Sequence, residues 1–174
     1  GYLKNEPITD APEIYHLFSF LTVVGALLKR NAYLPFSYKR IFPNLWTVLV
    51  AKSSTFRKSS ALFFALKLAN EVDENVILPE EFSLEGLYEL LSENPEGIFP
   101  IDEFSHFFKQ FHRTYMSGGI EFFLKLYEND AQSRRLLKES GCQINEPCIS
   151  ILSATTLEGI SSSLKEREIK TGLM

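Results

Sequence analysis

Apolar residues are most concentrated over residues 45–51, where Leu-Trp-Thr-Val-Leu-Val-Ala forms a run rich in β-branched and aromatic side chains. A short run of this composition is typical of a buried strand. A loop of small and polar residues follows over 52–57, and the apolar stretch from Ser59 to Val72 predicts a helix. Strand, polar loop and helix in this order indicate the first unit of a βαβ fold.

A long helix is expected before this unit. Asp10 stands where it can cap the free N–H groups of a helix start, and Glu13 completes a capping box. Apolar residues then recur every three or four positions, which predicts the buried face of an amphipathic helix. They are Ile14, Leu17, Phe18, Leu21, Val24 and Leu28. We therefore expect an arm and lead-in helix over 1–40 and an α/β core over 41–174, joined in one continuous globular unit.

The rest of the chain alternates between short apolar runs and helical patterns. Strands are expected at 76–78, 98–101 and 148–154, and helices at 83–91, 104–111 and 120–127. Pro100 argues against a central position for its strand, because it would remove a ladder hydrogen bond there. A hairpin is expected to turn at Ser140-Gly141. The chain is thus predicted to be an α/β protein with a mostly parallel sheet, an N-terminal helix and an appended hairpin.

The composition supports a folded core. The 174 residues are 45% hydrophobic and 23% charged, with a formal net charge of −4. These values exclude a disordered or collagen-like chain. No apolar run approaches the roughly 20 residues of a membrane helix, so no membrane partner is expected. Two cysteines form no disulfide framework, which favours a reducing, cytoplasmic location.

The sequence Arg57-Lys58-Ser59-Ser60 lies where the first strand and its loop give way to the helix. A helix start offers backbone N–H groups and a positive dipole end to a phosphate. Lys58 would hold the β- and γ-phosphates there, and the hydroxyl of Ser59 would ligate Mg²⁺. The pattern G-x-x-x-x-G-K-[ST] is not met, because Lys52 and Arg57 occupy its glycine positions. An ordinary capped helix is the alternative interpretation.

Two carboxylates follow the strand at 98–101. Asp102 and Glu103 are expected at the C-terminal edge of the sheet, where open α/β sheets bind their ligands. In phosphoryl transfer one such acid orients the Mg²⁺ shell and another aligns or deprotonates the attacking water. Thr155 and Thr156 follow the strand over 148–154, at the edge where a γ-phosphate sensor is expected. A plain surface turn and helix capping are the simpler interpretations of these residues.

Residues 42–51 and 57–59, 97–104 and 146–156 resemble one protein family. It is the uncharacterised P-loop NTPase domain found beside primase and helicase modules of phages, plasmids and other mobile elements. Residues 11–18 fit the lead-in helix of that family, and the resemblance extends over roughly residues 9–174. Members commonly tolerate arginine in place of the glycine before the lysine, as Arg57 does here.

The resemblance implies a RecA-like core, the cofactors ATP and Mg²⁺, and a helicase-like role in the replication or mobility of DNA. In that case Lys58 and Glu103 would be catalytic, and Ser59 and Asp102 would hold Mg²⁺. The remaining nucleotide contacts would be Ser53, Ser54, Thr55, Arg57, Ser60 and Thr155. The expected partners are single-stranded DNA, a primase module and further copies in a hexamer. The family continues into another core strand after Met174, which indicates a fragment.

Three functions are therefore open. The first is an ATPase of the helicase type, which would bind and hydrolyse Mg-ATP. The second is a degenerate nucleotide-binding or scaffold module that docks DNA or a primase and does not hydrolyse, because the glycines of the loop are missing. The third is a structural α/β domain without a ligand. Nucleotide turnover separates the first two, and nucleotide binding separates both from the third.

Overall fold

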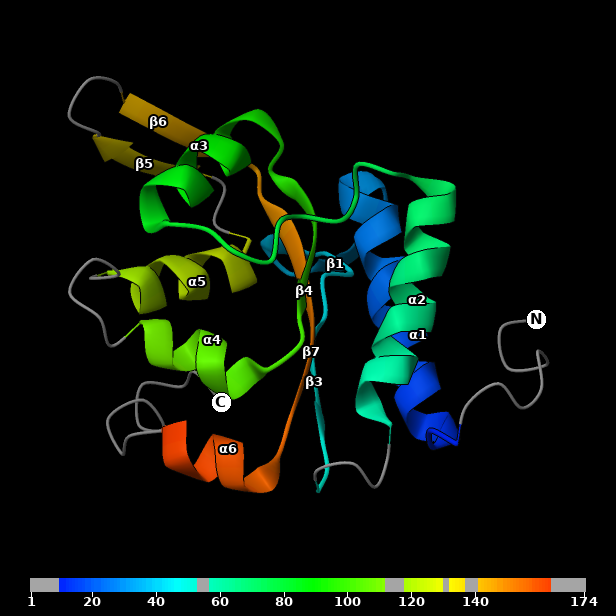
Figure 1. Ribbon diagram of the computed structural model, residues 1–174. Coiled ribbons are helices and arrows are strands. Elements are labelled where there is room, and N and C mark those ends of the chain that lie inside the picture. Colours follow the sequence, from blue (N-terminus) through cyan, green and yellow to red (C-terminus); the bar gives the residue numbers. More distant parts are fainter. Residues whose placement is uncertain (1–9, 53–56, 112–117, 130–131, 137–140, 164–174) are drawn as a thin grey trace.

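A parallel three-stranded sheet forms the centre of the protein (Figure 1). Its strands are β3 (Trp46–Val50), β7 (Cys148–Thr155) and β4 (Glu96–Ile101), in the order β3-β7-β4. The last of them in the sequence is thus the central one, and all of its residues are buried. The computed structural model describes residues 10–52, 57–111, 118–129, 132–136 and 141–163.

The three strands end at the same edge of the sheet. Val50 lies beside Thr155 in the register of β3 and β7, and Ile101 lies beside Ser153 in that of β4 and β7. This edge faces downward in Figure 1, where the chain leaves β3 toward α2 and leaves β4 toward α4. The parallel α/β class predicted from the sequence is confirmed.

Helices cover both faces of the sheet (Figure 1). On one side, α1 (Glu13–Leu28) and α2 (Lys58–Val72) pack against each other and against the sheet. Small residues such as Ala61 and Ala65 are fully buried there, which lets the helices approach closely. On the other side lie α3 (Leu84–Glu93), α4 (Phe104–Gln110) and α5 (Gly119–Tyr127), and α6 (Leu157–Ser163) packs beside α4.

Phenylalanine rings fill the second of these layers. The rings of Phe107 and Phe123 have their centroids 5.4 Å apart, in an edge-to-face arrangement that aromatic pairs prefer. The side of α4 that bears these rings is thus a core face. Its members Phe107, Phe108 and Phe111 are buried, and Phe104 is half-buried against the same cluster.

Two antiparallel hairpins extend from this framework. The predicted one consists of β5 (Gln132–Leu136) and β6 (Gly141–Asn145). Gly141 belongs to its second strand, and residues 137–140, which include Ser140 of the expected turn, lie outside the described residues. The other hairpin, β1 (Leu34–Phe36) and β2 (Lys39–Ile41), was not predicted. This hairpin follows a single 3-10 turn, η2 (Lys29–Asn31). The division expected between the lead-in region over 1–40 and the core over 41–174 falls inside β2.

The strand expected at 76–78 is reduced to a single parallel bridge between Ile77 and Ile98. β4 is therefore an edge strand of the three-stranded sheet, which accommodates Pro100 because no further ladder needs its missing N–H. The expected capping box of α1 is wrong. The N-cap of α1 is Pro12 without a side-chain cap, and the carboxylate of Asp10 instead pairs with Arg57 at 3.2 Å.

The apolar stripe of α1 faces the opposite way from the prediction. Leu17 and Leu21 are 40% and 41% exposed, whereas Ser19 and Thr22 are fully buried. The residues of the inner face are small, and two of them are polar, which lets α1 lie very close to its neighbours. A side chain at Gly25 would place its Cβ 2.0 Å from the carbonyl oxygen of Pro43, and the hydroxyls of Thr22 and Thr47 are 2.6 Å apart.

None of the described helices has the length and apolar content to cross a membrane.

Candidate functional site

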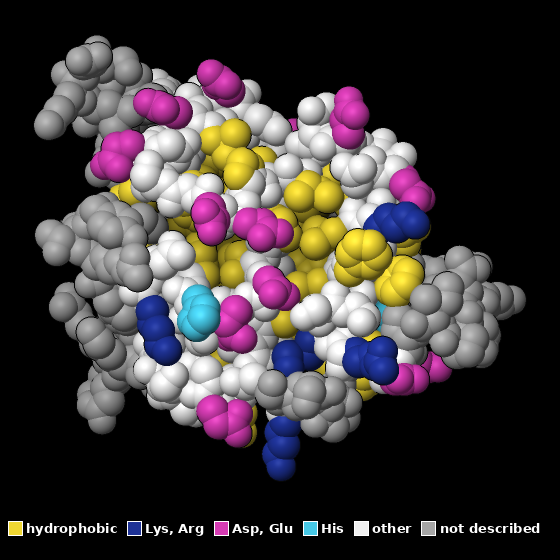
Figure 2. All heavy atoms as spheres, viewed as in Figure 1, with side chains coloured by type: hydrophobic (Ala, Val, Ile, Leu, Met, Phe, Trp, Pro, Cys, Tyr) yellow, Lys and Arg dark blue, Asp and Glu magenta, His cyan; other side chains and the backbone are white. Residues whose placement is uncertain are grey.

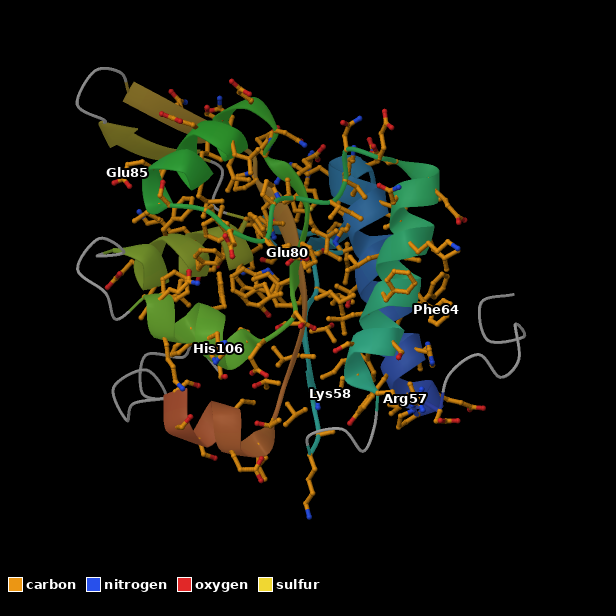
Figure 3. The ribbon with its side chains drawn as sticks, in the orientation of Figure 1. Arg57, Lys58, Phe64, Glu80, Glu85 and His106 are labelled. Carbon is orange, nitrogen blue, oxygen red and sulfur yellow. The ribbon has the colours of Figure 1, made fainter. Side chains whose placement is uncertain are left out.

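Lys58 is the first residue of α2 and lies at the C-terminal edge of the sheet (Figure 3). Its Nζ donates hydrogen bonds to the carbonyl oxygens of Ala51, at 3.2 Å, and Lys52, at 3.4 Å. The ammonium group is thus folded back over the beginning of the loop that follows β3. The bonds are to neutral backbone acceptors, so a phosphate offered at this position would be a stronger partner for the charge.

Arg57 is the N-cap of α2 and adopts the left-handed conformation, with φ 39° and ψ 46°. A residue with a Cβ pays roughly 1–2 kcal/mol for this conformation, and glycine pays little. The position is the one at which the phosphate-loop pattern has its second glycine. The chain therefore keeps the backbone shape that a glycine would give, although the residue is an arginine. The guanidinium points to Asp10, and both side chains are mostly exposed.

Ser59 and Asp102 bring two distant parts of the chain together. The Oγ of Ser59 donates a hydrogen bond of 3.2 Å to Oδ1 of Asp102. Ser59 comes from the first turn of α2, and Asp102 follows the last residue of β4. A hydroxyl and a carboxylate oxygen are ligands that Mg²⁺ accepts, and Mg²⁺ in phosphate sites usually takes only one or two protein ligands. This pair therefore fits the expected metal position.

Glu103 is held by three hydrogen bonds that all reach its Oε1. They come from Oγ1 of Thr155 at 2.5 Å, from Oγ of Ser105 at 2.8 Å and from the backbone N–H of Ser105 at 3.2 Å. Glu103 is also the N-cap of α4. The carboxylate thus joins the ends of β4 and β7 at the C-terminal edge of the sheet, and its orientation is fixed from both sides.

The surroundings of Glu103 favour its charged form. Partial burial would raise the pKa of the carboxyl, but the hydrogen bonds from Thr155 and Ser105 outweigh it, with a further contribution from His106. The pKa of Glu103 is accordingly lowered, so the group is an ionised carboxylate at neutral pH. A carboxyl with a lowered pKa is a weaker base, so this group is better suited to accept a hydrogen bond from a water molecule than to take up its proton.

Thr155 and Thr156, at the end of β7, have hydroxyl groups with different partners. Thr155 is completely buried and binds Glu103, whereas the Oγ1 of Thr156 accepts a hydrogen bond of 3.0 Å from the N–H of Gly159 and so caps α6. A Cβ at Gly159 would lie 2.9–3.1 Å from the hydroxyls of Thr155, Thr156 and Ser105. The capping role expected for this segment is confirmed for Thr156. Glycine at 159 leaves room for the hydroxyls around Glu103.

These groups surround a pocket of about 380 Å³. Its lining residues are Arg57, Lys58, Ser59, Ser60, Asp102, Glu103, Ala154 and Thr156. Figure 2 shows charged side chains of both signs gathered over this lower part of the molecule, below a band of hydrophobic atoms. In Figure 3, Lys58 and His106 lie on opposite sides of the lower sheet edge. The pocket therefore combines a cation, two carboxylates and a helix start in one place.

The structure brings together most of the residues that the sequence singled out. Ser53, Ser54 and Thr55 lie outside the described residues. Ser105 was missed as a partner of Glu103, although an acidic residue directly before a predicted helix is a capping signal. Within the described ranges, no three His, Cys, Asp or Glu side chains are grouped as a metal site.

Cys148 is not a candidate nucleophile. Its thiol is 1% exposed at the start of the central strand, and burial, together with Glu96, raises its pKa to about 11. The reactive thiolate is therefore scarce at neutral pH.

Comparison with known proteins adds no relative: no protein-family model matches the chain, and no curated protein or solved structure matches it.

Proposed function

We propose that this protein binds Mg-ATP in the pocket at the C-terminal edge of its sheet. The observation that carries the proposal is the contact of 3.2 Å between Ser59 of α2 and Asp102 after β4. It joins the end of a lysine-bearing loop to the carboxylate of a second strand. A phosphate loop and an acidic strand end need this juxtaposition to share one Mg²⁺ ion.

Each residue of the pocket has a role in this proposal. The backbone N–H groups at the start of α2 and the ammonium of Lys58 would bind the β- and γ-phosphates. Lys58 would exchange its two carbonyl partners for phosphate oxygens. Ser59 and Asp102 would hold Mg²⁺, which neutralises charge on the phosphates. The loop residues Ser53, Ser54 and Thr55, with Arg57 and Ser60, would line the phosphate chain.

Hydrolysis is proposed to depend on Glu103. Its ionised carboxylate would align or deprotonate the attacking water. Thr155 is buried and donates to Glu103, so it would respond to a γ-phosphate through that carboxylate and not by direct contact. Because the pKa of Glu103 is lowered, the carboxylate is charged before the nucleotide arrives, but it is also a weaker base than an ordinary glutamate, which favours alignment of the water over its deprotonation.

The finer assignment of a RecA-like core rests on the sequence resemblance. The parallel order β3-β7-β4, with β7 and its Thr155 in the centre, is compatible with it. The wider role that we propose is that of a helicase-like ATPase in a cytoplasmic replication protein of a mobile element, with single-stranded DNA, a primase module and further copies in a hexamer as partners. That wider role rests on the sequence resemblance.

A nucleotide-binding module without hydrolysis is the second candidate, and two observations favour it. Arg57 stands in the left-handed position where a phosphate loop has glycine. In addition, Oε1 of Glu103 already accepts three hydrogen bonds. A carboxylate that is engaged in this way would need to exchange partners before it could hold a water molecule.

The two carboxylates distinguish the candidates. Asp102→Asn should weaken Mg²⁺-dependent ATP binding, because a metal ligand loses its charge. Glu103→Gln keeps the size and the hydrogen-bond acceptor of the side chain, so it should spare ATP affinity while turnover falls by roughly 10²- to 10⁴-fold. Both are measured by nucleotide titration and by phosphate release, with and without single-stranded DNA. Equal turnover of the parent and Glu103→Gln, above a blank without enzyme, would remove Glu103 from the mechanism. Tight binding without turnover in either would establish the non-hydrolysing module.

A further inference from the structure

The charges of this protein are strongly segregated along the chain. Eight of its 18 Lys and Arg residues, and none of its 22 Asp and Glu residues, fall within residues 14–70. The net charge of −4 conceals this basic segment. Where the cations of such a segment are exposed and unpaired, they attract a polyanion to the surface of the protein.

The β1–β2 hairpin lies in the middle of that segment and presents aromatic rings to solvent. Every residue of its two strands is exposed. Tyr38, in the two-residue loop, is 93% exposed, Phe36 is 58% exposed and Tyr33, just before β1, is 48% exposed. A two-stranded hairpin with both faces in water gains little stability from burial. Rings held in this position therefore contribute little to the hydrophobic core.

Two cations stand among these rings. Lys39 is paired with Phe36 in the register of the hairpin, and the guanidinium carbon of Arg40 lies 4.5 Å from the centre of the Tyr33 ring. Among the described residues, neither Lys39 nor Arg40 forms an ion pair. By contrast, Lys29 is paired with Asp73 at 2.9 Å, so the basic residues of this segment do not all share the same environment.

We propose that the β1–β2 hairpin binds single-stranded nucleic acid. Unpaired bases stack on Tyr38 and Phe36, and Lys39 and Arg40 contact the phosphates. Exposed aromatic rings beside cations are the chemistry of sequence-tolerant single-strand binding, whereas the bases of a duplex are already stacked and paired. The segment over 14–70 itself contributes no carboxylate against a phosphate backbone. Carboxylates from other segments pair with Lys29, Arg30 and Arg57, but among the described residues none of them pairs with Lys39 or Arg40. The β1–β2 hairpin would provide the DNA contact that the proposed function requires. It lies outside the nucleotide pocket, so its binding of a single strand does not depend on ATP.

The test is fluorescence anisotropy of a labelled 20-residue oligothymidine, without nucleotide, over a series of salt concentrations. Tyr38→Ala should weaken binding about five- to a hundredfold, the usual loss for one stacked base, and leave the slope of log affinity against log salt unchanged. Tyr38→Trp should restore the affinity. Lys39→Gln with Arg40→Gln should instead reduce the slope by about 0.7 for each phosphate contact removed.

The controls separate this surface from general charge and from the nucleotide pocket. Lys109→Gln removes one positive charge at an exposed position of α4, outside the acid-free segment, and should leave binding unchanged, whereas Lys39→Gln alone should weaken it. The oligothymidine titration contains no nucleotide. Its outcome is therefore independent of whether the pocket binds ATP. Equal affinity of the parent and Tyr38→Ala would overturn the proposal, as would equal binding of a duplex. Self-association or vesicle binding that depends on Tyr38, without oligothymidine binding, would assign the hairpin to another partner and also overturn it.

Discussion

At the scale of single residues, the two adjacent carboxylates of the site differ in what surrounds them. Asp102 is exposed and meets one hydroxyl, that of Ser59. Glu103 is half-buried and joins two strand ends through Thr155 and Ser105. Asp102 can thus turn to a metal ion at little cost, whereas Glu103 is held in one orientation. Different roles for the two acids follow from this difference in environment.

A substitution at Arg57 tests whether the backbone of the loop is already that of a phosphate loop. Arg57→Gly should relieve the strain of the left-handed conformation, and the exposed ion pair with Asp10 that it loses is worth at most about 1 kcal/mol. Stability should therefore stay within about 1 kcal/mol of the parent, and Mg-ATP affinity should be preserved or improved. Arg57→Val should be less stable than either, because a β-branched residue is strained at positive φ. Urea denaturation and nucleotide titration measure both effects. A collapse of the Gly variant would show that the arginine side chain is structural.

At the scale of elements, the sequence pattern predicts the parts of the fold that have continuous apolar runs. β3, β4, β7 and α2 were all expected close to their observed bounds, because continuous apolar runs and a polar loop leave few other interpretations. The site followed from them, because parallel strands end at a common edge. Ser105 and the carbonyl partners of Lys58 were missed, since short-range contacts depend on the exact path of the loop.

The orientation of α1 could not be predicted from periodicity. The face of α1 with large apolar residues is the more hydrophobic one, so periodicity assigns it to the interior. The face with small residues lies inside instead, because only small side chains fit close to Pro43 and Thr47. The β1–β2 hairpin was missed for a related reason. Its residues are exposed on both faces, so they show no alternation between apolar and polar positions.

Two substitutions in α1 test this orientation. Leu21→Gln lies on the exposed stripe and should change the free energy of unfolding by no more than about 0.5 kcal/mol. Ala26→Leu enlarges a side chain that is 1% exposed in the core and should lower stability by roughly 1–3 kcal/mol. Denaturant unfolding compares both variants with the parent. A large loss in Leu21→Gln with a neutral Ala26→Leu would restore the orientation that periodicity suggests.

At the scale of the whole molecule, the pocket exists only because the sheet joins segments that are far apart in the sequence. Lys58, Asp102 and Thr155 each follow or end a different strand, and β7, the last to be reached along the chain, lies between the other two. The charges are arranged at the same scale. The basic segment over 14–70 supplies Arg57 and Lys58 to the pocket, and the acidic remainder supplies Asp102 and Glu103.

The most direct test of the central claim is a calorimetric titration of Mg-ATP into the parent, Lys58→Ala and Lys67→Ala. Lys67 lies exposed on the same helix and outside the pocket lining, so it is the matched control for charge. The parent and Lys67→Ala should bind one Mg-ATP with equal affinity. Lys58→Ala should bind about ten- to a hundredfold more weakly, because a charge-assisted contact to phosphate is lost. No binding by the parent, or equal affinity of the parent and Lys58→Ala, would contradict a nucleotide site at this edge of the sheet.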